Sequence, residues 1–297
     1  MANAFFRESV GPEAVPILVI SSNWPDLDAF VMLSHDHAAV LMRRTFGHSL
    51  VLLPFLAVGL ACILKRFYPR FSWTTLMGLS VLGMIVHLLF DLINSFGVVL
   101  LWPLSYWRPE LGIVFIIDFI LAGLMISPLL ICWPRRLRSR LGLISRISAA
   151  CVIVYFLFCA GNRALALQTL GKASAGQAPS FSYVFPEPLG PHRWKGITRE
   201  GNLYRIYLIH SLTGTSELKD EVTTEAGDPA VQAARFSRFG RKLEWFFKAP
   251  VWTVEARTPQ GVEVSVYDLR FRSLVIRRGG PFGFRMLVRP NGSVERK

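Results

Sequence analysis

Four ionisable side chains lie in or beside the apolar stretches of this 297-residue chain: His48, His87, Asp91 and Asp118. Such groups are costly to place in hydrocarbon, so each is a candidate for function. His87 and Asp91 are four residues apart, which places them on one face of a helix. Asp118 interrupts the apolar run IVFIIDFIL and is the hardest of the four to explain by structure alone.

Two further aspartates precede these residues in the string PDLD. Imidazole and carboxylate groups both coordinate Zn²⁺ and similar divalent ions, and several carboxylates can bridge two ions. A metal held by such a set would lower the pKa of a bound water and polarise a phosphoryl or acyl oxygen. The sequence therefore predicts a divalent-metal site, with zinc as the expected ion, formed by Asp26, Asp28, His48, His87, Asp91 and Asp118.

Each of these residues also has a structural interpretation. A histidine at the end of a span is often only interfacial, and PDLD is typical of a turn that caps a helix. His87 and Asp91 would also serve as an inter-helix hydrogen bond that holds a bundle together. A second polar cluster is His35, Asp36 and His37; in a helix its two histidines would point apart and could not both bind one metal, and the alternative is that these are loop residues.

The apolar stretches predict the elements that must position these side chains. Four of them approach the roughly 17–25 residues that a helix needs to cross a bilayer. They are His48–Leu64, Trp73–Ile93, Leu111–Trp133 and Ile147–Leu167, and an amphipathic segment over Val15–Leu33 precedes them. We therefore expect a membrane α-helical bundle of about four to five spans, followed by a soluble α+β, β-rich C-terminal domain.

Composition divides the chain into three parts. Residues 1–170 are predicted to form a polytopic membrane domain with the metal site, and the Gly-, Ser-, Ala- and Pro-rich segment 171–192 is predicted to be a linker. Residues 193–297 are expected to form the soluble domain. Asp228 followed by Pro229 predicts the start of a helix that ends before Pro250. The predicted strands of this domain are Tyr204–His210, Val251–Arg257, Val262–Phe271 and Phe282–Val288.

Basic residues predict the direction of the chain across the membrane. The loops at 65–72 and 134–146 carry an excess of Lys and Arg, whereas 94–110 is nearly balanced. The positive-inside rule places the two basic loops in the cytoplasm. Residues 1–47, 94–110 and the C-terminal domain are then expected outside, with the six candidate ligands at the outer membrane face.

The chain as a whole is basic and apolar. It is 52% hydrophobic and 18% charged, which excludes a wholly soluble or disordered protein. Its net charge is +13, most of it in the C-terminal half. A basic domain beside a membrane favours anionic headgroups, and no nucleic-acid-binding motif is present. We therefore expect membrane lipids, and no nucleic acid, as partners. The four cysteines lie in apolar runs without CxxC spacing and are expected in the core.

Several strings resemble the YdjM-like family of inner-membrane proteins, which are thought to be metal-dependent hydrolases. They are PDLD at 25–28, RRTFGHSL at 43–50, HLLFDLINSFGVVLLWPLS at 87–105 and the aspartate of IVFIIDF at 113–119. Their order and spacing are specific, above all HxxxD followed by a Ser/Gly turn and LWP. The family often carries a soluble β-rich extension, which FPEPLGPHRWKGI and VEVSVYDLRF resemble.

The resemblance implies metal ligands at the same six positions and a multi-pass location in the cell inner membrane. Through a distant relation to zinc-dependent phospholipase C and related nucleases, it also implies phosphoester hydrolysis. Two departures stand out: no Thr-His pair precedes Pro25, and Arg43 and Arg44 stand where members often have His-Arg. Either the natural start lies upstream or the site has fewer ligands.

Three functions are consistent with these patterns. The first is a membrane-bound metal-dependent hydrolase that acts on a phosphoester or lipid-like substrate with metal-activated water, Asp91 or Asp118 being the expected general base. The alternative is a non-enzymatic membrane scaffold whose polar residues hold the helices together. The third, a proton or ion translocator, is disfavoured because internal repeats are not evident and the polar residues gather at one face.

Overall fold

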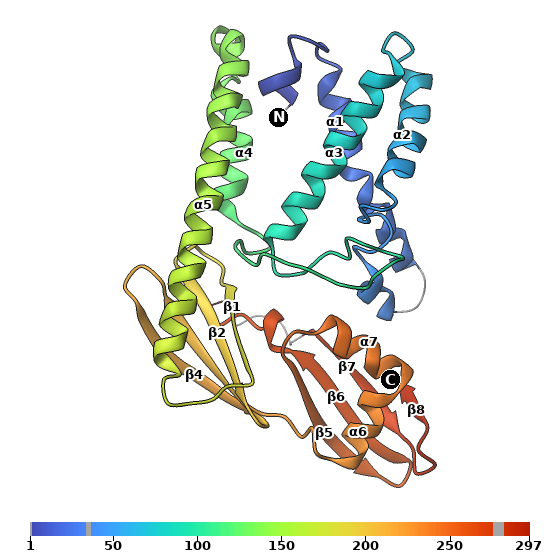
Figure 1. Ribbon diagram of the computed structural model, residues 1–297, viewed down its shortest axis with the longest axis vertical. Helices are drawn as coiled ribbons and strands as arrows, with labels where there is room; N and C mark the ends of the chain where they lie inside the picture. The colour runs from blue at the N-terminus through green and yellow to red at the C-terminus, as the bar shows by residue number, and fades with distance from the viewer. Residues whose placement is uncertain (1, 34–36, 276–281) are drawn as a thin grey trace. The chain divides into compact units, whose positions relative to one another are not determined.

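The computed structural model describes residues 2–33, 37–275 and 282–297. The chain forms two compact units, Met1–Cys159 and Ala160–Lys297. The predicted cluster of His35, Asp36 and His37 lies outside the described residues and side chains. Figure 1 shows that the first unit is helical and that the second contains the strands.

The first unit packs α1, α2 and α3 side by side (Figure 1). Small residues allow α1 and α3 to approach closely, because a Cβ added at Gly83 would lie 2.4 Å from the Cβ of Ser21. The helical elements are η1 (Ala2–Phe6), α1 (Ala14–Asn23), η2 (Pro25–Leu33), η3 (His37–Met42), α2 (Leu53–Phe67), α3 (Trp73–Ile93), α4 (Phe119–Ile131), η4 (Arg135–Arg140) and α5 (Leu141–Ala173), which continues into the second unit.

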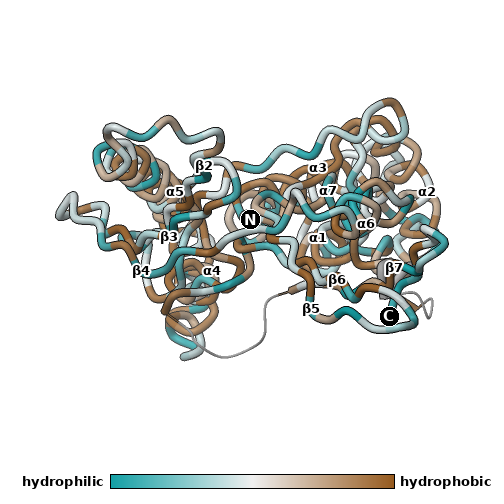
Figure 2. The backbone as a smooth tube through the Cα atoms, turned by 90° about the horizontal axis from the view of Figure 1, so that it is seen from below, coloured by the Kyte–Doolittle hydropathy of each residue, from teal (hydrophilic) through white to brown (hydrophobic). Residues whose placement is uncertain are grey.

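Two helical segments among the described residues are long and apolar enough to cross a membrane, Trp73–Ile93 and Arg135–Ala173. Figure 2 shows extended hydrophobic stretches along the helices of this unit. These two helices are candidate spans, and the count of four to five spans stays a prediction. Helices α2 and α4 are shorter, at 15 and 13 residues. They begin late because Pro54 occupies the first turn of α2 and Asp118 caps α4.

The N-terminal segment lies at the same end of the unit as the basic loops. Glu13 forms a 2.5 Å ion pair with Arg70, and Nε of Arg146 donates to the carbonyl of Ala4. Helix α1 then leads to η2 at the other end (Figure 1). The expectation that all of residues 1–47 lie opposite the basic loops is therefore wrong for residues 4–13, where acidic side chains pair with loop arginines.

The second unit contains two antiparallel sheets, each with its strands in sequence order. Phe185, Ile197 and Tyr204 of the first sheet share a core with Val251 and Leu269, which come from the second half of the unit. The predicted β-rich α+β C-terminal domain is thus confirmed as a two-sheet domain. Its strands are β1 (Phe181–Pro186), β2 (Arg193–Glu200), β3 (Leu203–His210), β4 (Thr215–Thr223), β5 (Pro250–Thr258), β6 (Gly261–Asp268), β7 (Gly283–Val288) and β8 (Val294–Arg296).

The segment 171–192, predicted as a linker, contains the end of a helix and a complete β-strand. Helix α5 extends to Ala173, and β1 pairs with β2 from Phe181 opposite Arg199 to Pro186 opposite Trp194. The apolar residues of β1 are buried against the sheet, which composition averaged over the segment does not reveal. The division between compact units also falls earlier than residue 170, after Cys159.

The single helix predicted after Asp228 is two helices, α6 (Pro229–Phe236) and α7 (Arg238–Phe246). The predicted cap is present, since Asp228 accepts from two backbone N–H groups of α6. Ser237 breaks the helix with an extended backbone, and its side chain accepts from the backbone N–H of Gly240. Gly240 permits the sharp bend, because a Cβ there would lie 2.0 Å from the carbonyl oxygen of Ala234.

Candidate metal centre

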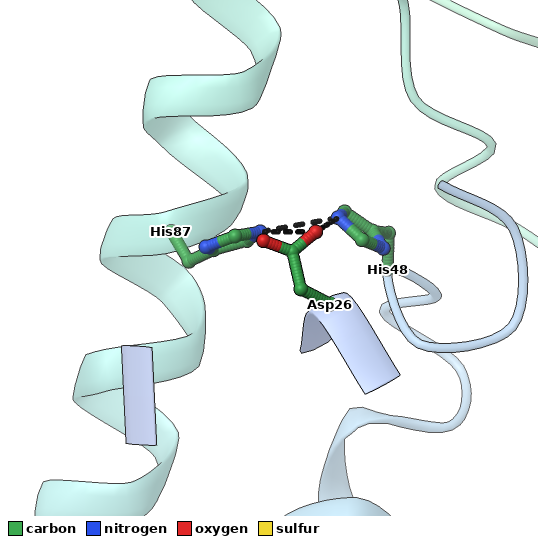
Figure 3. A group of neighbouring side chains, drawn as sticks. All are labelled: Asp26, His48 and His87. Atoms are coloured by element: carbon green, nitrogen blue, oxygen red, sulfur yellow. Dashed lines mark hydrogen bonds and ion pairs between the residues drawn. The ribbon is translucent and has the colours of Figure 1, made fainter. Parts of the chain in front are cut away.

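Three side chains from different segments meet at one point of the helical unit. Asp26 comes from η2, His48 from the loop before α2, and His87 from α3; Figure 3 shows the carboxylate between the two rings. Nε2 of His48 lies 3.1 Å from Nε2 of His87. Each of these nitrogens lies 3.8 Å from Oδ1 of Asp26. All the ligand atoms are therefore close enough together to hold one ion.

Asp91 adds a fourth donor one helical turn beyond His87. Its Oδ2 lies 3.0 Å from Nε2 of His48 and 3.6 Å from Nε2 of His87. Zinc bonds of roughly 2.0–2.1 Å in a tetrahedron place ligand atoms about 3.3 Å apart. The distances among Asp26, His48 and His87, and those from Asp91 to the two imidazoles, are 3.0–3.8 Å and bracket that value. The donor chemistry and the spacing both fit a divalent ion such as zinc.

Asp28 lies behind His48 rather than beside the other donors. It is fully buried, and its Oδ2 is 2.9 Å from Nδ1 of His48 while also accepting from the backbone N–H of Thr45 at 3.0 Å. A carboxylate on Nδ1 fixes the ring and directs Nε2 toward a metal. Asp28 is therefore placed to orient His48.

Arg44 forms an ion pair with Asp91. Its Nε lies 2.8 Å from Oδ2 of Asp91, its Nη1 donates to Oδ1 of Asn94 at 3.0 Å, and its guanidinium stacks over Phe96. The backbone φ of Arg44 is 60°, a left-handed conformation that a non-glycine residue adopts at a cost of order 1 kcal/mol. Its contacts with three residues offset this strain.

The electrostatic field of the cluster favours a positive charge at His48. Nδ1 of His48 lies 2.9 Å from Oδ2 of Asp28 and its Nε2 lies 3.0 Å from Oδ2 of Asp91, so two carboxylates contact this buried imidazole. The same carboxylates would stabilise a cation bound at Nε2.

Close backbone packing fixes the loop that carries His48. A Cβ added at Gly47 would lie 2.1 Å from the carbonyl oxygen of Pro25, so this position accepts no side chain without displacing η2. The chain after α3 supports the same loop, since the N–H of Val99 donates to the carbonyl of Arg44 and the N–H of Leu50 to the carbonyl of Leu100.

Asp118 makes its contacts elsewhere in the unit. Its Oδ1 accepts from the backbone N–H of Leu121 at 2.8 Å, which caps α4, and its Oδ2 accepts from the hydroxyl of Tyr155 at 2.7 Å. The structure thus brings together four of the six predicted ligands, places Asp28 behind one of them, and gives Asp118 a capping role. No pattern in the sequence predicted a role for Arg44 or Asn94; Arg44 stood out only because it and Arg43 replace the His-Arg of the family.

These features define a class of protein in which an apolar helical unit carries a candidate metal centre and is followed by a two-sheet β unit. Residues 1–164 match the family model described as YdjM inner membrane protein. This match covers more than half of the chain, which therefore belongs to the YdjM family, as the motif resemblance predicted. Membership also agrees with the predicted inner-membrane location.

The chain is also similar to part of a bacterial protein. The uncharacterized protein YfhP of Bacillus subtilis (strain 168) is 28% identical to this chain over 93 residues. The alignment covers 31% of this chain and 28% of that protein, so the chain spans less than a third of the relative's length. No solved structure matches the chain significantly.

Proposed function

We propose that this protein is a membrane-bound, divalent-metal-dependent hydrolase with zinc as its expected metal. Asp26, His48, His87 and Asp91 would be the ligands. The observation that carries the proposal is the set of 3.0–3.8 Å separations of the two imidazoles from each other and from the Asp26 and Asp91 carboxylates. The hydrogen bond that Nδ1–H of His48 donates to Asp28 supports it, because it gives the imidazole the orientation that a metal ligand needs.

A divalent ion at this position would supply the Lewis acidity that activates water and polarises a phosphoryl oxygen. The residues of the chain would do the rest. Arg44 would hold Asp91 in place through their ion pair. Asp26 is the most exposed ligand, and its carboxylate would take the proton of the attacking water.

The surroundings of the cluster support a lipid-like phosphoester as substrate. Exposed apolar side chains come from η2 and from the chain after α3, the two segments that frame the cluster. Tyr and Trp are typical of the membrane–water interface, where a lipid headgroup would arrive laterally. These exposed residues are Phe30, Leu33, Leu104, Tyr106 and Trp107.

We further propose a multi-pass arrangement with the cluster at the outer membrane face and the β unit outside the cytoplasm. The basic loop 65–72 precedes α3, whereas His87 and Asp91 lie near its other end (Figure 1). The positive-inside rule would place the loop in the cytoplasm and hence the cluster at the opposite face.

A non-enzymatic scaffold is the alternative, and one observation favours it. The Arg44–Asp91 and His48–Asp28 pairs already link η2, the His48 loop and α3 without any ion. Polar contacts of this kind hold helices together in membranes. A scaffold requires no metal, so metal content separates the two functions.

The deciding experiment measures metal content by elemental mass spectrometry on the full chain purified in detergent without chelators. The His87→Ala/Asp91→Ala double variant removes two donors, and the His192→Ala/Asp220→Ala variant changes the same residue types in the β unit. We expect near-stoichiometric zinc in the wild type and the control variant, and background zinc in the first. Wild-type protein that takes up no metal even after reloading would overturn the proposal and favour the scaffold.

A further inference from the structure

Arg43 stands at the open side of the candidate metal centre. Its Nη2 lies 3.8 Å from Oδ1 of Asp26, the same oxygen that faces the two imidazoles. The side chains of Arg43 and Asp26 are 34% and 41% exposed, whereas His48 is fully buried and His87 is 15% exposed. A ligand that approaches the centre from solvent therefore meets Asp26 and Arg43 first.

The guanidinium of Arg43 keeps hydrogen-bond donors for such a ligand. A separation of 3.8 Å from Asp26 is an ion pair but too long for a hydrogen bond. Its Nε is buried and has no hydrogen-bond partner within the part of the chain that the structure describes, so the exposed part of the side chain is what a ligand would meet. Arg44 differs, since Asp91, Asn94 and Phe96 hold its guanidinium in place. Arg43 is thus the arginine of the pair that remains able to bind a ligand.

The charge balance of the loaded centre favours an anion. The carboxylates of Asp26, Asp28 and Asp91 outnumber the guanidiniums of Arg43 and Arg44 by one. Adding a divalent cation would change the sign of the local charge from negative to positive. A planar guanidinium beside a divalent ion matches the geometry of phosphate oxygens, which accept paired N–H bonds.

We propose that Arg43 binds the anionic oxygens of a phosphate group at the open side of the metal centre. The phosphate belongs to a phosphoester or to a phospholipid headgroup. This inference rests on the proposed metal-dependent function and deepens it, because it names the residue that recognises the substrate and the charge that the substrate carries. Arg43 acts on the bound phosphate, while Arg44 positions Asp91.

The test is phosphate binding by the zinc-loaded full chain in detergent, measured by isothermal titration calorimetry with inorganic phosphate. We expect Arg43→Gln to bind phosphate about tenfold more weakly than the wild type, since a charge-assisted pair is lost. Arg43→Lys keeps the charge but not the planar fork, so its affinity lies between the two. Arg140→Gln removes an exposed arginine of η4 and leaves phosphate affinity unchanged. Zinc content is measured on every sample and stays at the wild-type level.

A second titration uses short-chain phosphatidic acid. Tighter binding of this lipid than of inorganic phosphate, with the same loss in Arg43→Gln, identifies a lipid headgroup as the ligand; equal affinity identifies the phosphate group alone. Equal phosphate affinity in the wild type and Arg43→Gln at equal zinc content, or no phosphate binding by zinc-loaded wild type, overturns the inference but leaves the metal centre standing. Wild-type protein that binds no zinc overturns the proposed function, and the inference with it.

Discussion

Both units of this chain bury charged side chains, but the partners of these charges differ. In the β unit, Glu187 accepts from the hydroxyl of Ser273 at 2.6 Å and from the backbone N–H of Leu274 at 3.0 Å, and it lies 3.5 Å from Nζ of Lys195. Lys195 in turn donates to the carbonyl of Arg270. Both charges are almost fully buried and closed off by the protein itself.

The helical unit arranges its charges differently. The ligand atoms of Asp26, His48 and His87 lie close together, and Oδ2 of Asp91 lies beside the two imidazoles. Oδ1 of the buried Asp28 has no hydrogen-bond partner within the described residues. One side of the cluster is open to solvent. A buried charge by itself therefore does not indicate a ligand site. The helical cluster differs from the Glu187–Lys195 pair in two ways. Several atoms that can bind a metal lie close together in it, and one of its sides is open to solvent.

The largest expected effect comes from Gly47→Ala. The new methyl group would lie 2.1 Å from the carbonyl oxygen of Pro25, so η2 and the His48 loop must separate and the donors no longer converge. We expect zinc content to fall to background. Gly59→Ala is the matched control, because a Cβ there meets no atom within 4 Å. A zinc content at the wild-type level in Gly47→Ala would show that the cluster does not depend on this packing.

Breaking the closed pair of the β unit is expected to affect stability without affecting metal. Glu187→Leu leaves the Lys195 ammonium buried without its carboxylate and should cost about 3–5 kcal/mol. Pulse proteolysis in urea on the full chain measures this loss, and zinc content should stay unchanged. Glu187→Leu/Lys195→Met removes both charges and should recover much of the stability. A loss of zinc in Glu187→Leu would contradict the separation of the two roles.

The closed pair also predicts a pH dependence. Burial lowers the pKa of Lys195 from 10.5 to about 8, although the nearby Glu187 opposes this shift. Between these values the unfolded chain binds the proton and the folded chain does not, so stability rises with pH from about 8 to 10.5. The contribution is about 3 kcal/mol. Pulse proteolysis across this range measures the slope, and a similar slope in Lys195→Met would assign it to other groups.

The orienting role of Asp28 predicts a smaller loss of metal affinity. Asp28→Asn keeps the size of the side chain but removes the negative charge that holds Nδ1 of His48. Such outer partners typically contribute about 10- to 100-fold to metal affinity. Competition with a chromophoric chelator measures the change in zinc affinity. Complete loss of zinc would instead indicate that Asp28 is itself a ligand.

The smallest expected effect is that of Asp118→Ala. Loss of the cap on α4 should cost about 1 kcal/mol, because the N–H of Leu121 loses its acceptor. Thermal unfolding in detergent should show this loss while zinc content stays at the wild-type level. Loss of zinc in this variant would return Asp118 to the ligand set that the sequence predicted.

Local patterns in the sequence predicted the kinds of chemistry and the local elements. The spacing of His87 and Asp91 predicted a shared helix face, and both lie on α3, whose bounds match the predicted span. Asp228 and Pro229 predicted a helix start that the structure contains. The motif strings predicted the family. These features depend on residues close together in the chain, where periodicity and capping rules apply.

Which of the candidate residues lie close together depends on the tertiary structure. Asp26 and Asp28 are two residues apart, yet one faces the open cluster and the other lies behind His48. Asp118 resembles Asp91 in its apolar surroundings, but caps α4 instead. The physical reason is that convergence depends on how distant segments pack, here through the close contact of Gly47 with Pro25. That packing is a property of the folded chain and leaves no local pattern in the sequence.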